Sequence, residues 1–244
     1  MLSLKRRTED FLSTYFNRLK LRAPLFSTGE HGLRFDLQHG VTGTEMYFKE
    51  VVDRATELFE ATFMQDDRTL FYLIDYKFKK RKIRFSNYCF KQIDGLLKEH
   101  VSYSMIKGLY DDGYGGLDIR NIAQVEVSRH RIDHRKIFAA IANKDFSRLP
   151  GLDHYGFLGS KEVFLINLDN NIIFHMYDDR GLDIISAEID SLRSVYKEYN
   201  HWILNCNKDE IDAKFENGWS ESAMPQEVGG IYYYPHSFDI HSRL

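Results

Sequence analysis

Residues 163–185 read VFLINLDNNIIFHMYDDRGLDII, and this stretch decides the fold. Two apolar runs flank the turn sequence Asp169-Asn170-Asn171, and Asn and Asp tolerate the left-handed backbone that tight hairpin turns require. A further apolar run follows Gly181. We therefore predict a hairpin over residues 163–177 and another strand over residues 182–185.

Helices and strands alternate in the rest of the chain. A stripe at three- and four-residue intervals predicts a helix that begins at a capping box formed by Thr42 and Glu45; its members are Tyr47, Phe48, Val51, Val52, Ala55, Leu58, Phe59 and Phe63. Helices are also expected over 6–21, 87–100, 134–146 and 186–203, and strands over 33–37, 101–109 and 121–128. Residues 70–78 and 83–85 are expected to form a hairpin.

This order predicts the α+β class, an antiparallel or mixed β-sheet with packed helices in a single domain. The domain would span residues 1–244, and residues 147–151 are the candidate subdomain break. Hydrophobic residues make up 43% of the 244 residues and charged residues 28%, which is ordinary for a globular protein.

Composition also limits the function classes. A net charge of -3 argues against a protein built chiefly to coat nucleic acid. No apolar run approaches the roughly 20 residues that a membrane-spanning helix needs, so we expect no membrane partner. Two distant cysteines, and no secretory signal at the N-terminus, predict a cytoplasmic protein.

Two loops share one pattern: Tyr-Asp-Asp, then glycine, then Leu-Asp-Ile. If they lie side by side they form an acidic edge, which attracts a basic protein partner and speeds the encounter with it. The predicted partner-binding residues are Asp111, Asp112 and Asp118 in the first loop and Asp178, Asp179, Arg180 and Asp183 in the second. Nearby basic residues would instead leave two ordinary solvated turns.

The second loop has two further interpretations. Asp178, Asp179 and Asp183 could bind Mg²⁺ or Ca²⁺, with His175 nearby, although the spacing departs from the twelve-residue calcium loop. In the structural interpretation, which we favour, Asp178 caps the turn, Arg180 pairs with a carboxylate, and Gly181 supplies a positive φ. Gly113 would do the same in the first loop, and we predict no metal or cofactor.

Asp75-Tyr76-Lys77 has the Asp-x-Lys arrangement of many metal-dependent nucleases, in which a carboxylate holds the metal and a lysine stabilises charge. A basic run around it could bind the phosphates of a nucleic acid or form a solvated edge, and we favour the solvated edge over nucleic-acid binding there. The run consists of Lys77, Lys79, Lys80, Arg81, Lys82 and Arg84.

The segment from 164 to 215, centred on Tyr177-Asp178-Asp179-Arg180-Gly181-Leu182-Asp183, resembles a bacterial family of unknown function with a Tyr-Asp-Asp-Arg-Gly-x-Asp signature. Leu33-Arg34-Phe35 and residues 51–63 and 141–146 are similar to its longer members. The resemblance supplies no reaction. By analogy it implies a small intracellular partner of a bacterial toxin.

We therefore expect a cytoplasmic protein-binding module, an immunity protein that neutralises a basic toxin domain through its acidic loops, rather than an enzyme. The alternative is a metal-dependent nuclease or phosphoesterase that uses Asp75 and Lys77, or the Asp178, Asp179 and Asp183 loop. The role of the aromatic tail, residues 231–234, and the oligomeric state are left open.

Overall fold

The computed structural model describes residues 2–76, 82–110, 119–146 and 158–216, together with the backbone of two short strands near the C-terminus. The chain separates into two compact units, Met1–Leu204 and Asn205–Leu244. The second unit contains α5 (Asn205–Glu216) and an antiparallel hairpin of β8 (Gln226–Val228) and β9 (Ile231–Tyr233). Most of the aromatic tail is thus in β9, and Tyr234 lies outside the described residues.

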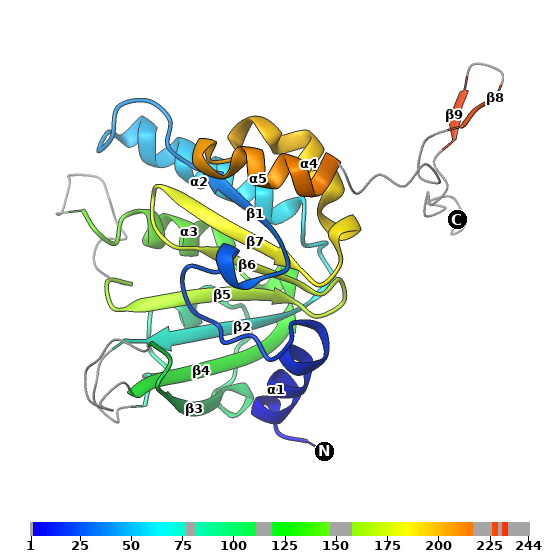
Figure 1. Ribbon diagram of the computed structural model, residues 1–244. Coiled ribbons are helices and arrows are strands. Elements are labelled where there is room, and N and C mark those ends of the chain that lie inside the picture. The colour runs from blue at the N-terminus through cyan, green and yellow to red at the C-terminus, as the bar shows by residue number, and fades with distance from the viewer. Residues whose placement is uncertain are drawn as a thin grey trace, which may run out of the picture. The chain divides into compact units, whose positions relative to one another are not determined.

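The first unit is built on one seven-stranded antiparallel sheet in the order β1-β7-β6-β5-β2-β4-β3, which Figure 1 shows face on. This confirms the predicted α+β class. The strands are β1 (His31–Asp36), β2 (Arg68–Asp75), β3 (Ser102–Lys107), β4 (Ile119–Ser128), β5 (Lys161–Asn167), β6 (Ile172–Met176) and β7 (Gly181–Ser186). Residues 147–151, the candidate subdomain break, lie outside the described ranges.

The β5–β6 hairpin has the turn that its sequence predicts. Asn171 has φ 52°, a left-handed conformation that Asn tolerates better than most residues. After the turn, successive β6 side chains point to opposite faces, so Phe174 and His175 enter different layers. The expected hairpin of residues 70–78 with 83–85 is wrong, because β4 and β5 occupy both sides of β2.

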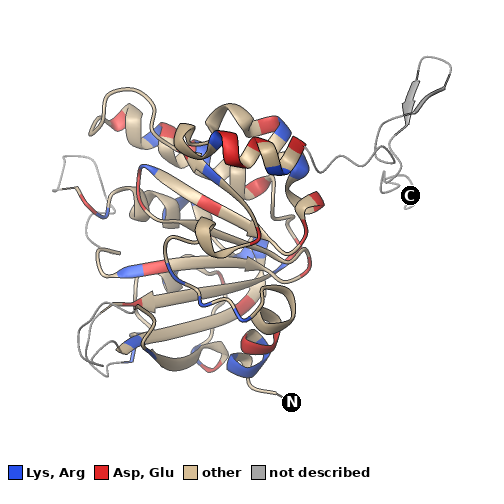
Figure 2. Cartoon of the chain, viewed as in Figure 1, with Lys and Arg blue, Asp and Glu red and all other residues tan. Residues whose placement is uncertain are grey.

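One face of the sheet is covered by α2 (Glu45–Glu60) and α3 (His134–Ala142). Phe59 of α2 and Phe138 of α3 both meet Phe174 of β6, with ring centroids 5.4 Å apart in each case. Figure 2 shows few charged residues within the strands and many on the helices, as expected for an apolar layer between them.

The other face is partly covered by α1 (Leu4–Tyr15). Thr8 of α1 donates a hydrogen bond of 2.7 Å to Gln124 of β4, and Phe11 and Leu12 pack against the buried cluster on this face. The helix ends before the predicted residue 21, because Asn17 and Arg18 take positive φ values of 47° and 59°. The α2 cap is Thr44 rather than Thr42, and its side chain accepts a hydrogen bond from Tyr47 N–H.

The two edges of the sheet differ. On the side of β1 that faces away from β7, Phe35 forms an isolated β-bridge with Ile203, and the Arg34 carbonyl accepts a hydrogen bond from Leu204 N–H. Ile203 lies beyond α4 (Arg193–Tyr199), so this segment covers the β1 edge. β3 is the last strand on the opposite side. Among the helices that the structure describes, none has both the length and the apolar character that crossing a bilayer requires.

Candidate functional site

One end of the sheet, here called the loop end, is where β1, β2, β3 and β6 finish and where β4, β5 and β7 begin (Figure 1). The turn 177–180 joins β6 to β7 at this end. Residues 111–118, which lie outside the described ranges, follow Tyr110 and precede β4. The two predicted loops therefore start from one end of one sheet, but β5 and β2 separate their hairpins.

Asp178 holds the second turn together. Its Oδ1 accepts a hydrogen bond of 2.8 Å from the Arg180 backbone N–H, and its Oδ2 accepts one of 3.0 Å from Arg180 Nε. Only 7% of the Asp178 side chain is exposed, whereas 67% of the Arg180 side chain is exposed. Asp178 thus caps the turn, as the structural interpretation predicts, and Arg180 presents the accessible charge.

Asp179 ties the turn to α2. Its Oδ2 accepts a hydrogen bond of 2.5 Å from the Tyr47 hydroxyl, and both residues are buried. Burial raises the pKa of Asp179, and burial together with the Asp179 hydrogen bond raises the pKa of Tyr47 to about 12. The position of the turn is therefore fixed by the helix layer.

Asp183 is completely buried. It accepts hydrogen bonds from Arg34 Nε at 2.7 Å and Nη2 at 3.0 Å, and another of 2.9 Å from the Phe26 backbone N–H. Arg34 is also the cross-strand partner of Asp183 in the β1–β7 register. Its carboxylate oxygens face groups inside the protein, so Asp183 joins β1, β7 and the segment before β1 rather than facing solvent.

His175 lies beside Asp183 in the β6–β7 register and is also completely buried. Its ring stacks on Phe164 with centroids 4.2 Å apart. Burial lowers the pKa of His175 to about 3, with a smaller effect from Lys144, so the imidazole is neutral at pH 7. Neither ring nitrogen has a hydrogen-bond partner among the described residues.

Gly181 is required for a different reason from the one predicted. It begins β7 and is not among the described glycines with positive φ, so the expected left-handed backbone is wrong. A Cβ atom there would collide with the Tyr177 phenol and would lie 2.6 Å from the Phe35 carbonyl oxygen. Glycine therefore makes room for Tyr177. Gly113 lies outside the described residues.

The first loop starts from a partly buried polar cluster that sequence reasoning missed. The Tyr110 hydroxyl lies 2.9 Å from the Tyr76 hydroxyl and accepts a hydrogen bond of 3.3 Å from Ala23 N–H. The Arg120 guanidinium lies over both tyrosine rings, at 4.9 Å from Tyr76 and 5.4 Å from Tyr110. Burial raises the pKa values of Glu162, which contacts Tyr110, and of Tyr110 itself.

The signal for this cluster was present in the sequence, because a tyrosine stands next to each acidic motif: Tyr76 after Asp75 and Tyr110 before Asp111. The sequence does not show that the two tyrosines are close in space, because they are 34 positions apart. Asp111, Asp112 and Asp118 lie outside the described residues, so their placement is not described.

Asp75 lies at the loop end of β2, opposite Lys161 of β5. Its Oδ1 accepts a hydrogen bond of 3.2 Å from the Ser160 hydroxyl. Lys77 lies outside the described residues. Within the described ranges, no group of three His, Cys, Asp or Glu side chains could hold a metal ion, either here or around Asp178.

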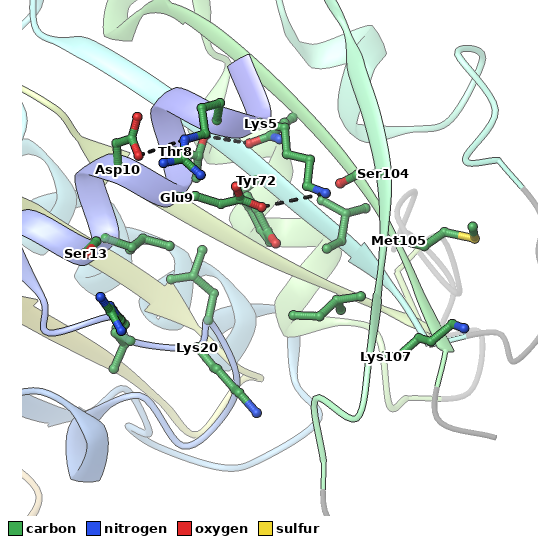
Figure 3. A pocket seen from close by; sticks show the side chains of 18 residues that line it. Lys5, Thr8, Glu9, Asp10, Ser13, Lys20, Tyr72, Ser104, Met105 and Lys107 are labelled. Atoms are coloured by element: carbon green, nitrogen blue, oxygen red, sulfur yellow. Dashed lines mark hydrogen bonds and ion pairs between the residues drawn. The ribbon is translucent and has the colours of Figure 1, made fainter. Parts of the chain in front are cut away.

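A pocket of about 580 Å³ lies between α1 and the edge strand β3, and Figure 3 shows its side chains. Its charged α1 residues pair with one another, Lys5 with Glu9 at 3.6 Å and Arg6 with Asp10 at 3.1 Å. These are i,i+4 pairs, which stabilise a helix without any ligand. The charged α1 side chains in this pocket are therefore already paired within the helix, and the loop end is the stronger candidate site.

Comparisons with known proteins identify a family of unknown function. A family model described as "Domain of unknown function (DUF3885)" matches residues 8–207. The "Uncharacterized protein YnaE" of Bacillus subtilis (strain 168) is 24% identical over 207 residues, which are 79% of this chain and 95% of that protein. No solved structure matches the chain. The prediction that the chain resembles a family of unknown function is thus confirmed.

Proposed function

We propose a protein-binding role for this chain, which belongs to the DUF3885 family of domains of unknown function. In this proposal the protein is a cytoplasmic bacterial immunity protein that neutralises a cognate toxin. Its binding surface is the loop end of the sheet. The observation that carries the proposal is that residues on both sides of this end are rigidly anchored.

Anchoring is visible at each loop. Asp178 and Asp179 fix the second turn to itself and to Tyr47 of α2. Tyr110, the residue before Asp111, is held by Tyr76 and by the backbone of Ala23. Binding residues are commonly carried by loops that a rigid scaffold positions, and this end of the sheet has that construction.

Charge suggests the kind of partner. Asp111, Asp112 and Asp118 bring three carboxylates within eight positions, which favours a basic partner and a fast, salt-sensitive encounter. A toxin that cleaves nucleic acid needs a basic surface to bind its substrate. Because Asp178 and Asp183 are buried and paired, they support the surface, and Arg180 is the residue of the second turn that a partner would touch.

The first test is purification of the tagged protein from its own host at moderate and at high salt. We expect a stoichiometric basic protein that is lost at high salt. With that partner in hand, Asp111→Asn and Asp112→Asn should lower the association rate, whereas Asp190→Asn should not, since Asp190 is an exposed acid elsewhere with 80% of its side chain accessible. Equal association rates for all three variants across a salt titration would refute contact through this loop.

Asp178→Asn is not a suitable contact test, because the substitution also weakens the turn. Arg180→Ala is cleaner, since this side chain is largely exposed and its loss leaves the backbone cap in place. If Arg180 contacts the partner, its removal should speed dissociation of the complex, while loss of its largely exposed pair with Asp178 should lower the melting temperature of the free protein by no more than a few degrees.

A second candidate is metal-dependent hydrolysis of phosphoesters by Asp75 and Lys77. The observation in its favour is the basic pocket beside Asp75, lined by Lys82, Arg84 and Lys161. Cleavage that needs Mg²⁺ or Mn²⁺ and disappears in a folded Lys77→Ala variant would support it. If the wild type cleaves neither nucleic acid nor small phosphoesters with these metals, this candidate fails.

A further inference from the structure

A pocket of about 410 Å³ opens at the loop end between the sheet and residues 82–87. Asp75 of β2 and Lys161 of β5, which are cross-strand partners, form the sheet side. Lys82, Arg84 and Ser86 come from residues 82–87. Positively charged side chains thus enter one cavity from two parts of the chain that are distant in sequence.

The basic side chains of this pocket lack ion-pair partners among the described residues. Within the described ranges, none of the ion pairs involves Lys82, Arg84 or Lys161. Elsewhere in the same ranges, many basic side chains have a carboxylate partner, as Arg34 and Arg135 do. Like charges that share a pocket repel one another, so an anion bound among them is stabilised by all three.

Asp75 is the one carboxylate among the described residues that line the pocket, and it does not cancel this charge. Asp75 accepts a hydrogen bond from Ser160, and among the described lining residues one negative charge against three positive ones leaves a surplus of two. A phosphate monoester carries about −1.5 to −2 charges at pH 7, which matches that surplus. Sulfonate or carboxylate groups carry a single charge and match it less well.

The donors also suit phosphate. Lysine supplies three N–H donors, arginine five in a planar fork, and serine one hydroxyl. The wall that carries Arg84 and Ser86 is held in shape by Asn87, whose side chain donates to the Arg84 carbonyl at 2.7 Å and accepts from Phe90 N–H at 3.1 Å. Lys82 is positioned with its ammonium 4.0 Å from the centre of the Tyr103 ring.

We propose that this pocket binds the phosphate group of a small phosphorylated molecule. A volume of about 410 Å³ exceeds what a phosphate ion fills and falls in the range of small-molecule sites. A concave pocket in a chain of net charge -3 fits a small ligand better than the extended basic stripe that a nucleic acid follows. The proposal does not depend on the immunity role, but the pocket is the one that favours the phosphoesterase candidate, so phosphate binding is tested without Mg²⁺ or Mn²⁺ to keep binding apart from hydrolysis.

The test is isothermal titration calorimetry on the full chain at low ionic strength, with inorganic phosphate, pyrophosphate and a nucleoside monophosphate as probes. Arg84→Gln and Lys161→Gln should each weaken binding about tenfold or more, because a charge-assisted hydrogen bond is lost. The matched control is Lys98→Gln, an exposed lysine that does not line this pocket, which should bind as the wild type does.

Asp75→Asn gives a result of opposite sign. Removing a negative charge from the pocket should strengthen phosphate binding by roughly two- to tenfold, whereas loss of a metal ligand would weaken any metal-dependent binding. The melting temperature of each variant separates lost binding from lost folding. Tighter binding of the nucleoside monophosphate than of inorganic phosphate assigns the ligand as an ester, and the reverse order assigns it as free phosphate.

The proposal is overturned if the wild type does not bind inorganic phosphate or pyrophosphate at millimolar concentrations. It is also overturned if Arg84→Gln and Lys161→Gln, both folded, bind as the wild type does, or if Asp75→Asn weakens phosphate binding. Binding of a single-stranded oligonucleotide without binding of the small anions would replace it with a nucleic-acid surface.

Discussion

The Asp183–Arg34 pair offers the strongest quantitative test of the fold at the loop end. Asp183 has no exposed surface and accepts three hydrogen bonds, two from Arg34 and one from the Phe26 N–H. Asp183→Ala leaves the guanidinium, whose side chain is only 18% exposed, without this carboxylate. Removing one partner of a buried pair costs about 3–5 kcal/mol.

For a chain of this size, 4 kcal/mol corresponds to a fall in melting temperature of roughly 8–16 °C. Circular dichroism at 222 nm would measure it, and urea titration would give the free energy of unfolding. The matched control is Asp190→Ala, since Asp190 also pairs with an arginine, Arg193, but is 80% exposed. That substitution should cost less than about 1 kcal/mol.

A double variant, Arg34→Met with Asp183→Leu, tests the cause. It removes both charges together, so most of the lost stability should return, apart from about 1–3 kcal/mol for the Phe26 N–H that loses its acceptor. The reasoning is refuted if Asp183→Ala costs no more than Asp190→Ala, or if the double variant is less stable than Asp183→Ala.

Two further predictions concern the same part of the sheet. His175 has a pKa lowered to about 3 against an ordinary value of 6.5, so its burial adds stability that is complete above pH 6.5 and is lost as the pH falls toward 3. His175→Phe should therefore flatten the fall in unfolding free energy over this window, by up to about 1.4 kcal/mol per pH unit. His201→Phe, at an exposed position, should leave that fall unchanged. If the unfolding free energies of both variants fall equally steeply with pH, the burial argument is contradicted. Gly181→Ala should cost about 1–3 kcal/mol, because its Cβ has no room beside the Tyr177 phenol and the Phe35 carbonyl oxygen. If Gly181→Ala melts at the wild-type temperature, the turn has room for a Cβ atom and the steric argument is wrong.

Local sequence patterns predicted the helices and turns that are determined by residues close together in the sequence. The stripe from Tyr47 to Phe63 predicted α2, because a helix that buries one face must repeat every three to four residues. The Asp169-Asn170-Asn171 sequence predicted the β5–β6 turn, because few residues other than Asn tolerate the φ of Asn171.

Other elements depend on contacts that no local pattern contains. Residues 87–100 have a weak helical period, yet they form short 3₁₀ turns, Cys89–Gln92 and Lys98–His100, separated by Gly95 at φ 58°. The partners of Asp183 could not be predicted either, because Arg34 is 149 positions away. For the same reason, the surface role expected for Asp183 does not match its burial.

The position of β1 has a consequence for synthesis of the protein. β1 is at the sheet edge and pairs only with β7 on the sheet side, so the ribosome must add about 150 more residues before Arg34 meets Asp183. At 5–20 residues per second this delay is roughly 7–30 s. We expect nascent chains to expose Leu33 and Phe35 to chaperones and proteases during that interval, and chains arrested before residue 181 should be cut near β1 while longer chains resist.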